Sequence, residues 1–158
     1  MTEQRRTSLI SLVVTGLVAL AVIALLAAPA KVHGDEGAFT RSADSTTIEW
    51  GPCPEFMPPG CALAVLQGNP AEPNADVFFK LRAGTTAPLH SHSSAERMVL
   101  VSGEMRVRYE GQAPVVLQAG TYAYGPANLP HDATCNSDED CVLFIAFEGP
   151  VDAHPVRE

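Results

Sequence analysis

From residue 46 onward, apolar and polar side chains mostly alternate, a period of two that is typical of β-strands with one buried face. The alternation is clearest in Met105–Tyr109, where arginines separate the apolar side chains, and a Ser-Gly turn divides this segment from Arg97–Val101 as in a hairpin. Nine short strands are predicted: Thr46–Trp50, Ala62–Gln67, Val77–Arg82, Arg97–Val101, Met105–Tyr109, Val115–Leu117, Thr121–Tyr124, His131–Cys135 and Val142–Phe147. Because no amphipathic helical pattern follows residue 35, the sequence predicts an all-β sandwich or barrel.

The first 34 residues follow a different pattern. Arg5 and Arg6 precede twenty uncharged positions, Leu9–Ala28, and small residues follow them. A basic start, an apolar run and a small-residue exit are typical of an N-terminal hydrophobic export helix. The run is long enough for an uncleaved membrane anchor as well as for a signal peptide. Both interpretations place residues 35–158 outside the cytoplasm, periplasmic or secreted, and limit any membrane contact to this segment.

The rest of the chain is predicted to be one domain between two polar segments. Residues 35–45 are a linker, 46–148 form the β-barrel and 149–158 form a polar, Pro-containing tail. The chain has a net charge of −8, but residues 35–158 hold seven basic and seventeen acidic side chains, a net charge of −10. Such an acidic domain, without a basic stripe, is unsuited to nucleic acid or an anionic membrane surface. The expected partner is a small molecule.

Three of the five histidines form a pattern with one glutamate. His90 and His92 are two residues apart, so a strand would place both imidazoles on the same face. Glu96 follows after a possible turn, and His131 follows a rigid Pro-Ala-Asn-Leu-Pro bend. Three imidazoles and a carboxylate suit one divalent transition metal, Fe, Mn, Cu, Ni or Zn. Four protein ligands on one side leave coordination positions open, which is typical of a catalytic site.

The spacing of these residues resembles the two motifs of the cupin superfamily. The first motif matches at every defined position: Gly84-x5-His90-x-His92-x3-Glu96-x6-Gly103. The second is similar: Gly120-x5-Pro126-x-Asn128-x2-His131. The chain departs from the family pattern at Thr121, where the family has an acidic residue, at Asn128, where it has Gly, and at Cys135, where it has Asn. Asn tolerates a left-handed conformation, so the bend at Asn128 is expected to form.

The resemblance covers residues 75–148 and implies a single jelly-roll (cupin) β-barrel with a metal inside its mouth. The family's ligand positions carry over to His90, His92, Glu96 and His131. Cupins include dioxygenases, isomerases, decarboxylases, storage proteins and sensing modules, so the resemblance does not fix the reaction. Relatives often pair through their outer strands, which leaves a homodimer open.

Alternation also suggests which side chains surround the metal. Met98 shares a face with Glu96, and Tyr109 belongs to the next inward row. The hydroxyl of Tyr122 or Tyr124 is a candidate donor to a metal-bound anion. These side chains predict a largely apolar pocket, which suits a small apolar or aromatic ligand. Packing in the barrel core is the alternative role for each of them.

Four cysteines in an exported domain predict two disulfides. Three pairings are open, and the local one, which joins Cys53 to Cys61 and Cys135 to Cys141, is favoured because each pair brackets a turn-rich loop. The alternative is that Cys135 is a metal ligand or a reactive thiol, because it lies close to His131.

Two functions compete. The first is a dioxygenase-type oxidoreductase, in which Glu96 is a metal ligand that can detach and act as a base. The second is a non-catalytic module that binds a metal or a small ligand. A metal-dependent isomerase or decarboxylase is disfavoured because such sites need a cation for an anionic substrate, and Arg97 has the opposite parity to Glu96.

Overall fold

The computed structural model describes residues 37–157, and every regular element in this range is a β-strand. The predicted export helix lies outside the described residues. Among residues 37–157, no helix meets the length and hydropathy that crossing a membrane requires. The strands are β1 (Gly51–Pro52), β2 (Ala62–Gln67), β3 (Asp76–Leu81), β4 (Thr86–Ser91), β5 (Glu96–Ser102), β6 (Glu104–Tyr109), β7 (Val115–Gln118), β8 (Tyr122–Gly125), β9 (His131–Cys135), β10 (Cys141–Phe147) and β11 (His154–Pro155).

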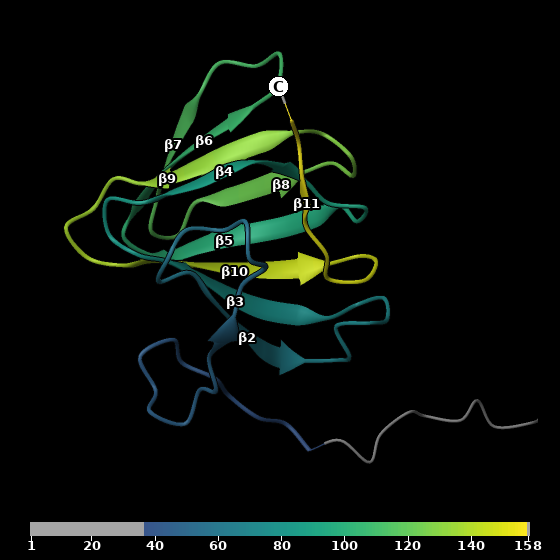
Figure 1. Cartoon of the computed structure of the whole chain (residues 1–158). Coiled ribbons are helices and arrows are strands. Elements are labelled where there is room, and N and C mark those ends of the chain that lie inside the picture. The colour runs from purple at the N-terminus through teal and green to yellow at the C-terminus, as the bar shows by residue number, and fades with distance from the viewer. Residues whose placement is uncertain (1–36, 158) are drawn as a thin grey trace, which may run out of the picture. The chain divides into compact units, whose positions relative to one another are not determined.

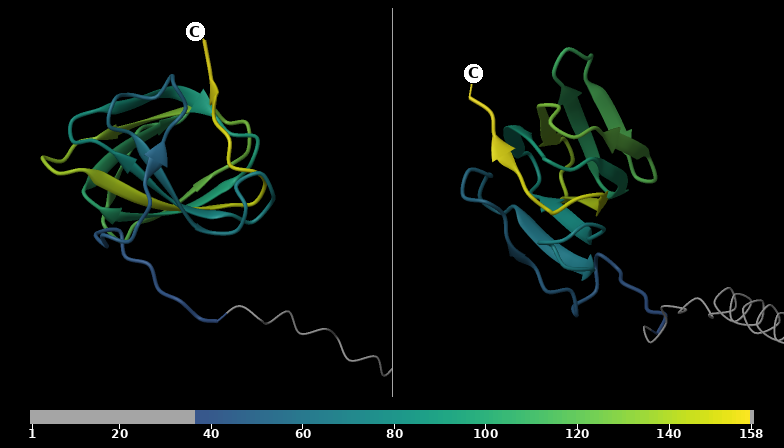
Figure 2. Two further views of the ribbon diagram at one scale, coloured as in Figure 1. Left: turned by 60° about the horizontal axis from the view of Figure 1, so that its bottom comes forward. Right: turned by 90° about the vertical axis from the view of Figure 1, so that its right-hand side faces the viewer.

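These strands form two antiparallel sheets that face each other. One sheet has the order β1-β2-β3-β10-β5-β8, and the other has the order β11-β4-β9-β6-β7. Both sheets contribute to one apolar core, with Leu100 and Leu143 from the first and Met105 and Ala133 from the second. Figures 1 and 2 show the strands of both sheets around this common interior. The all-β architecture predicted from the alternation is confirmed.

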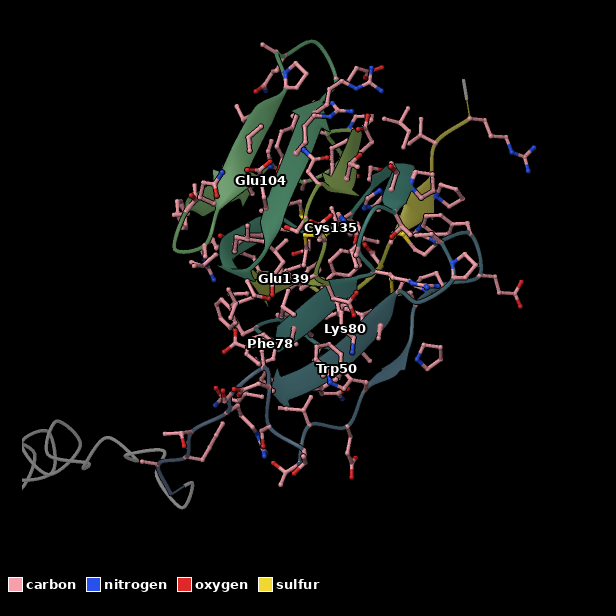
Figure 3. The ribbon with its side chains drawn as sticks, turned by 90° about the vertical axis from the view of Figure 1, so that its left-hand side faces the viewer. Trp50, Phe78, Lys80, Glu104, Cys135 and Glu139 are labelled. Atoms are coloured by element: carbon pink, nitrogen blue, oxygen red, sulfur yellow. A yellow bond between two sulfur atoms is a disulfide. The ribbon has the colours of Figure 1, made fainter. Side chains whose placement is uncertain are left out.

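The alternation of apolar residues in Thr46–Trp50 does not reflect a strand. Turns occupy this stretch, including a hydrogen bond from the Ile48 amide to the Ser45 carbonyl (3.2 Å). Its apolar side chains pack instead on the outer side of β3, where Trp50 stacks on Phe78 with ring centroids 6.4 Å apart. The Lys80 ammonium lies 4.2 Å from the centroid of the Trp50 ring, and both side chains are labelled in Figure 3. A segment that covers a sheet face can thus show the strand period without pairing.

Besides the two-residue β1, which follows the predicted Thr46–Trp50 segment, two further strands were not predicted from the sequence. One is β4, in which a proline interrupts the apolar pattern, and the other is β11 within the segment expected to be a tail. The two strands pair with each other, with His154 opposite Ser91 and Pro155 opposite His90. The end of the described chain therefore lies against the strand that carries the first histidine of the motif.

The two disulfides follow the local pairing. Cys53 is bonded to Cys61 and Cys135 to Cys141, and the Cα–Cα distance is 5.7 Å in both. The described residues contain no free cysteine, so the alternative role of Cys135 as a thiol or metal ligand is wrong. Cys135 and Cys141 are fully buried and tie the start of β10 to the end of β9 within the core.

Candidate metal centre

The three histidines of the sequence motifs converge in the interior of the barrel. His90 lies in β4, His92 lies just beyond the end of that strand, and His131 begins β9. His90 and His131 are direct partners in the β4–β9 register, and their ring centroids are 4.3 Å apart. One ring nitrogen from each of the three lies within 4.8 Å of the others. These three nitrogens could hold one metal ion between them.

Each imidazole is oriented by a backbone carbonyl. The Nδ1 atom of His90 lies 2.7 Å from the Pro88 carbonyl, and that of His131 lies 3.2 Å from the Leu129 carbonyl. The Nδ1 atom of His92 is bound to the carbonyl of Asp152. A neutral imidazole that donates from Nδ1 keeps a lone pair on Nε2. The backbone contacts therefore leave the three Nε2 atoms as potential ligands.

Glu96 brings a carboxylate to the same point. It is the first residue of β5 and only 3% exposed. Its Oε1 atom lies 3.4 Å from Nε2 of His92, and its Oε2 atom lies 3.8 Å from Nε2 of His131. No arginine or lysine is found among the described residues that line the surrounding cavity. The carboxylate thus lies in the interior facing imidazole lone pairs, with no cationic side chain to balance it.

The environment shifts the pKa of all four groups toward the neutral form. Burial lowers the pKa of His90 to about 4, with a further contribution from His92, and lowers that of His131 to about 3, with a further contribution from His90. Burial also lowers the pKa of His92. Burial, assisted by the negative charge of Asp152, raises the pKa of the Glu96 carboxyl to about 8. Neutral histidines are ready to ligate, whereas Glu96 needs a nearby positive charge to ionise.

This donor set fits a divalent transition metal. Three imidazole nitrogens and one carboxylate oxygen match the preferences of Mn, Fe, Ni, Cu and Zn. A buried carboxylate without a cationic partner is costly, and a bound cation removes that cost. The residues present therefore suit the metal that the sequence pattern implies.

The bend before His131 is held by the first motif. Asn128 has a φ of 61°, and its amide donates to the carbonyl of His92 at 2.8 Å. The expected left-handed conformation at this position, where the motif has glycine, is confirmed. The hydrogen bond joins the two motif segments and fixes where β9 begins, so that His131 faces His92.

A cavity of about 110 Å³ opens beside these groups. Its walls are mainly apolar and include Met98, Met105, Val107, Ile145 and Phe147. The sequence analysis predicted a largely apolar pocket, and the residues that line this cavity agree with that prediction.

The hydroxyl of Tyr109 lies at the same cavity. It is the one buried side-chain polar atom among residues 37–157 that has no hydrogen-bond partner. A Cβ atom placed on Gly125 would lie 2.9 Å from this hydroxyl oxygen and 3.1 Å from Oε2 of Glu96. Tyr109 and Glu96 therefore approach the same point of β8, where only glycine leaves room for both.

Comparison with known proteins agrees with this geometry. The family model described as "Cupin domain" matches residues 77–147. This part of the chain is a cupin domain. No curated protein matches the sequence of this cupin.

Solved structures with the same fold have diverse names. The cupin domain superposes on a DMSP lyase, DddQ, from Ruegeria pomeroyi DSS-3, with 20% identity and a TM-score of 0.60 over 69% of this chain and 61% of that one. It also superposes on the polyketide cyclase RemF from Streptomyces resistomycificus, with 15% identity and a TM-score of 0.61 over 76% and 87% of the two chains. An oxalate decarboxylase from Lactobacillus farciminis matches with 17% identity and a TM-score of 0.57 over 69% and 33%. The match spans 61% and 63% of the two DMSP-lyase chains, and at these identities the likeness concerns the fold.

Two predicted residues do not reach the site of this cupin. Tyr122 is 59% exposed and Tyr124 is 52% exposed, whereas Gly125 of the same strand is buried. Residues two apart on a strand share a face, and in β8 that face is the outer one. The expectation that one of the two tyrosines points inward is wrong, because residues two apart share a face and both hydroxyls lie on the outer side. Met98 and Tyr109, in contrast, line the cavity as expected.

Sequence reasoning missed several residues that line the cavity. They come from the Cys53–Cys61 loop and from the C-terminal segment: Cys53, Pro54, Met57, Val151, Asp152 and Ala153. Neither segment carries a motif, because irregular segments have no periodic sequence pattern and take their positions from tertiary contacts. The disulfide-closed loop was the one available signal, since its proline-rich sequence marks a fixed conformation.

Proposed function

We propose that this cupin is a mononuclear metal-dependent oxidoreductase of the dioxygenase type that acts on a small apolar or aromatic substrate. The observation that carries the proposal is the convergence of three Nε2 atoms and the Glu96 carboxylate at an apolar cavity that also holds the unpaired hydroxyl of Tyr109. His90, His92, Glu96 and His131 are the proposed ligands of one divalent transition metal.

Glu96 and Tyr109 would have separate roles beside the metal. When bound, the metal supplies Lewis-acid chemistry and open coordination positions. Glu96 balances the charge, and when its carboxylate detaches it can accept a proton from a weakly acidic substrate such as an enol or a phenol. Tyr109 can donate a hydrogen bond to a substrate oxygen, because its hydroxyl has no competing partner.

The cavity supports the proposed substrate class. Its volume of about 110 Å³ is smaller than that of cavities of about 150 Å³ that bind benzene, so the cavity restricts the substrate to a small molecule. Its apolar walls favour an uncharged molecule, and no lysine or arginine among the lining residues would hold a carboxylate substrate. This argues against a decarboxylase or isomerase of an organic acid, although two oxalate decarboxylase structures share the fold.

A non-catalytic binding module is the second candidate. It is favoured by the small volume of the cavity, about 110 Å³, and by its mainly apolar walls, which offer few polar groups to a reactant. Two disulfides support the further proposal that the domain works outside the cytoplasm, periplasmic or secreted, since such bonds persist in oxidising compartments.

The experiment is oxygen consumption by the purified protein loaded separately with Fe, Mn, Cu, Ni or Zn. Catechol and acetylacetone are suitable probes because each is small and weakly acidic. A dioxygenase consumes one molecule of oxygen per molecule of substrate, and the metal-free protein and the His92→Ala variant should consume none. Stoichiometric metal binding without oxygen uptake for any metal and probe would favour the binding module.

A further inference from the structure

The C-terminal segment crosses the metal centre and is fixed on both sides of it. We define the C-terminal strap as residues 149–156. Its amides form three hydrogen bonds to the barrel, from Gly149 to the Ser94 hydroxyl (2.7 Å), from Val151 to the Pro70 carbonyl (2.8 Å) and from Val156 to the Leu89 carbonyl (3.0 Å). Figure 1 shows β11 beside the end of β4, the strand with which it pairs, and Figure 2 gives two further views of this part of the chain.

Asp152, in the middle of the strap, holds the residues around His92. Its main-chain carbonyl is bound to Nδ1 of His92. Its carboxylate accepts from the Ser93 amide at 2.8 Å and also from the Ser93 hydroxyl. The second carboxylate oxygen lies 3.2 Å from Nε2 of His154. One residue of the strap therefore binds both the side chain of His92 and the backbone that follows it.

His92 differs from the other two histidines in how its ring is held. The Nδ1 atoms of His90 and His131 are bound to carbonyls two residues earlier in their own segments. The Nδ1 atom of His92 is bound to a carbonyl sixty residues away. The ring orientations of His90 and His131 are thus built into their local strands, whereas that of His92 depends on the strap.

We infer that Asp152 is a positioning residue of the metal centre, which sets the tautomer and orientation of His92 so that Nε2 faces the metal. The inference rests on the proposed metal function. A backbone acceptor at Nδ1 fixes the Nδ1–H tautomer and raises the basicity of Nε2, and loss of such an outer contact typically costs about 10–100-fold in metal affinity. The Asp152 carboxylate acts through its hydrogen bonds to Ser93, which hold the Asp152 carbonyl beside Nδ1 of the His92 ring.

The test compares Asp152→Ala with Asp152→Asn in the full chain, using Zn²⁺ as the probe in competition with a chelator. Asp152→Ala keeps the main-chain carbonyl but loses the contacts to Ser93, so it should bind Zn²⁺ up to about 10-fold more weakly than the parent, the lower end of the range for a lost outer contact. Asp152→Asn should recover part of the loss, because the amide oxygen still accepts from the Ser93 amide. Glu148→Ala is the matched control, because Glu148 precedes the strap, pairs with exposed Arg97 and does not line the cavity. The Zn²⁺ affinity of this variant should equal that of the parent.

A second readout does not need the metal. Nitrogen-15 NMR of the histidine rings in the metal-free protein should show His92 as one tautomer in the parent and as a mixture in Asp152→Ala. His90 and His131 should keep their tautomers, because their carbonyls lie in β4 and just before β9. If Asp152→Ala is poorly folded, Ser93→Ala removes the hydroxyl contact from the opposite side and should shift the same His92 signals.

The outcomes separate the inference from the proposed function. An unchanged His92 tautomer in both Asp152→Ala and Ser93→Ala, with parental Zn²⁺ affinity, would overturn the positioning role. A parent protein that binds no Zn²⁺ would instead refute the metal centre, and the NMR comparison would still decide whether Asp152 orients the ring. Equal losses of affinity at Asp152 and at Glu148 would indicate general destabilisation and would also count against the inference.

Discussion

Glu96 and Gly125 lie directly opposite each other across the β5–β8 pair, and a Cβ atom at Gly125 would lie 3.1 Å from Oε2 of Glu96. The same Cβ would lie 2.9 Å from the Tyr109 hydroxyl. A glycine on an outer strand of the sheet thereby controls the position of a carboxylate and a phenol that belong to two other strands.

Replacement of Gly125 by alanine should therefore disturb the site more than the fold. The added methyl group has to displace the end of Glu96 or of Tyr109, and overpacking of this kind typically costs about 1–3 kcal/mol of stability. We expect a weaker affinity for Zn²⁺ as well, measured by chelator competition. Gly51→Ala is the control, because a Cβ there meets only the Leu63 carbonyl at 3.7 Å. Parental Zn²⁺ affinity in Gly125→Ala would contradict the tight packing described.

The metal content of the protein tests the ligand set. We expect about one divalent transition ion per chain by elemental analysis, and the His92→Ala variant should lose it, because the remaining groups leave a gap on the strap side. The thermal stability of the two metal-free proteins serves as the control for folding. Retention of a full equivalent by His92→Ala would remove this histidine from the ligand set.

Metal binding should release a proton from Glu96. In the metal-free protein the pKa of Glu96 is about 8, so this carboxyl is mostly protonated at pH 7 and must ionise to ligate. The pKa values of His90 and His131 lie at about 4 and 3, so these rings release none at that pH. Calorimetry of Zn²⁺ binding in buffers of different ionisation enthalpy should show about one proton released, and affinity should rise with pH up to about 8.

The Glu96→Gln variant provides the comparison for this experiment. It should release no proton, and its Zn²⁺ affinity should be nearly independent of pH between 7 and 8. Glu139→Gln, at an exposed position, should behave like the parent. Equal proton release by Glu96→Gln and the parent would assign the proton to another group.

The hydroxyl of Tyr109 should matter for ligands and not for the fold. Because this buried hydroxyl has no partner, Tyr109→Phe should leave the free energy of unfolding unchanged or raise it by up to about 1 kcal/mol. Azide binding to the Co²⁺-loaded protein, followed by absorption spectroscopy, should weaken several-fold, because a donor to the bound anion is lost. Tyr122→Phe is the matched control, since Tyr122 is 59% exposed. A large loss of stability in Tyr109→Phe would point to a structural role instead.

Much of the site follows from local spacing. Two histidines separated by a single residue share a side of a strand, and the resemblance to the cupin motifs implies that His131 joins them, so the three-histidine cluster was expected from the sequence. The disulfides are predictable in the same way, because each joins cysteines that bracket one short loop. The left-handed turn at Asn128 followed from the residue type.

The sequence by itself determined which side chains share a face and which short loops are closed, because both depend on neighbours along the chain. Only the tertiary structure decided which face of β8 is inward, and it placed Tyr122 and Tyr124 outside and Gly125 against the site. It also decided that Trp50 covers a sheet without joining it and that Asp152 orients His92. The physical reason is that a period of two shows which residues share a face but not which face is buried. Short segments such as β11 pair only because of contacts with residues far away in the chain.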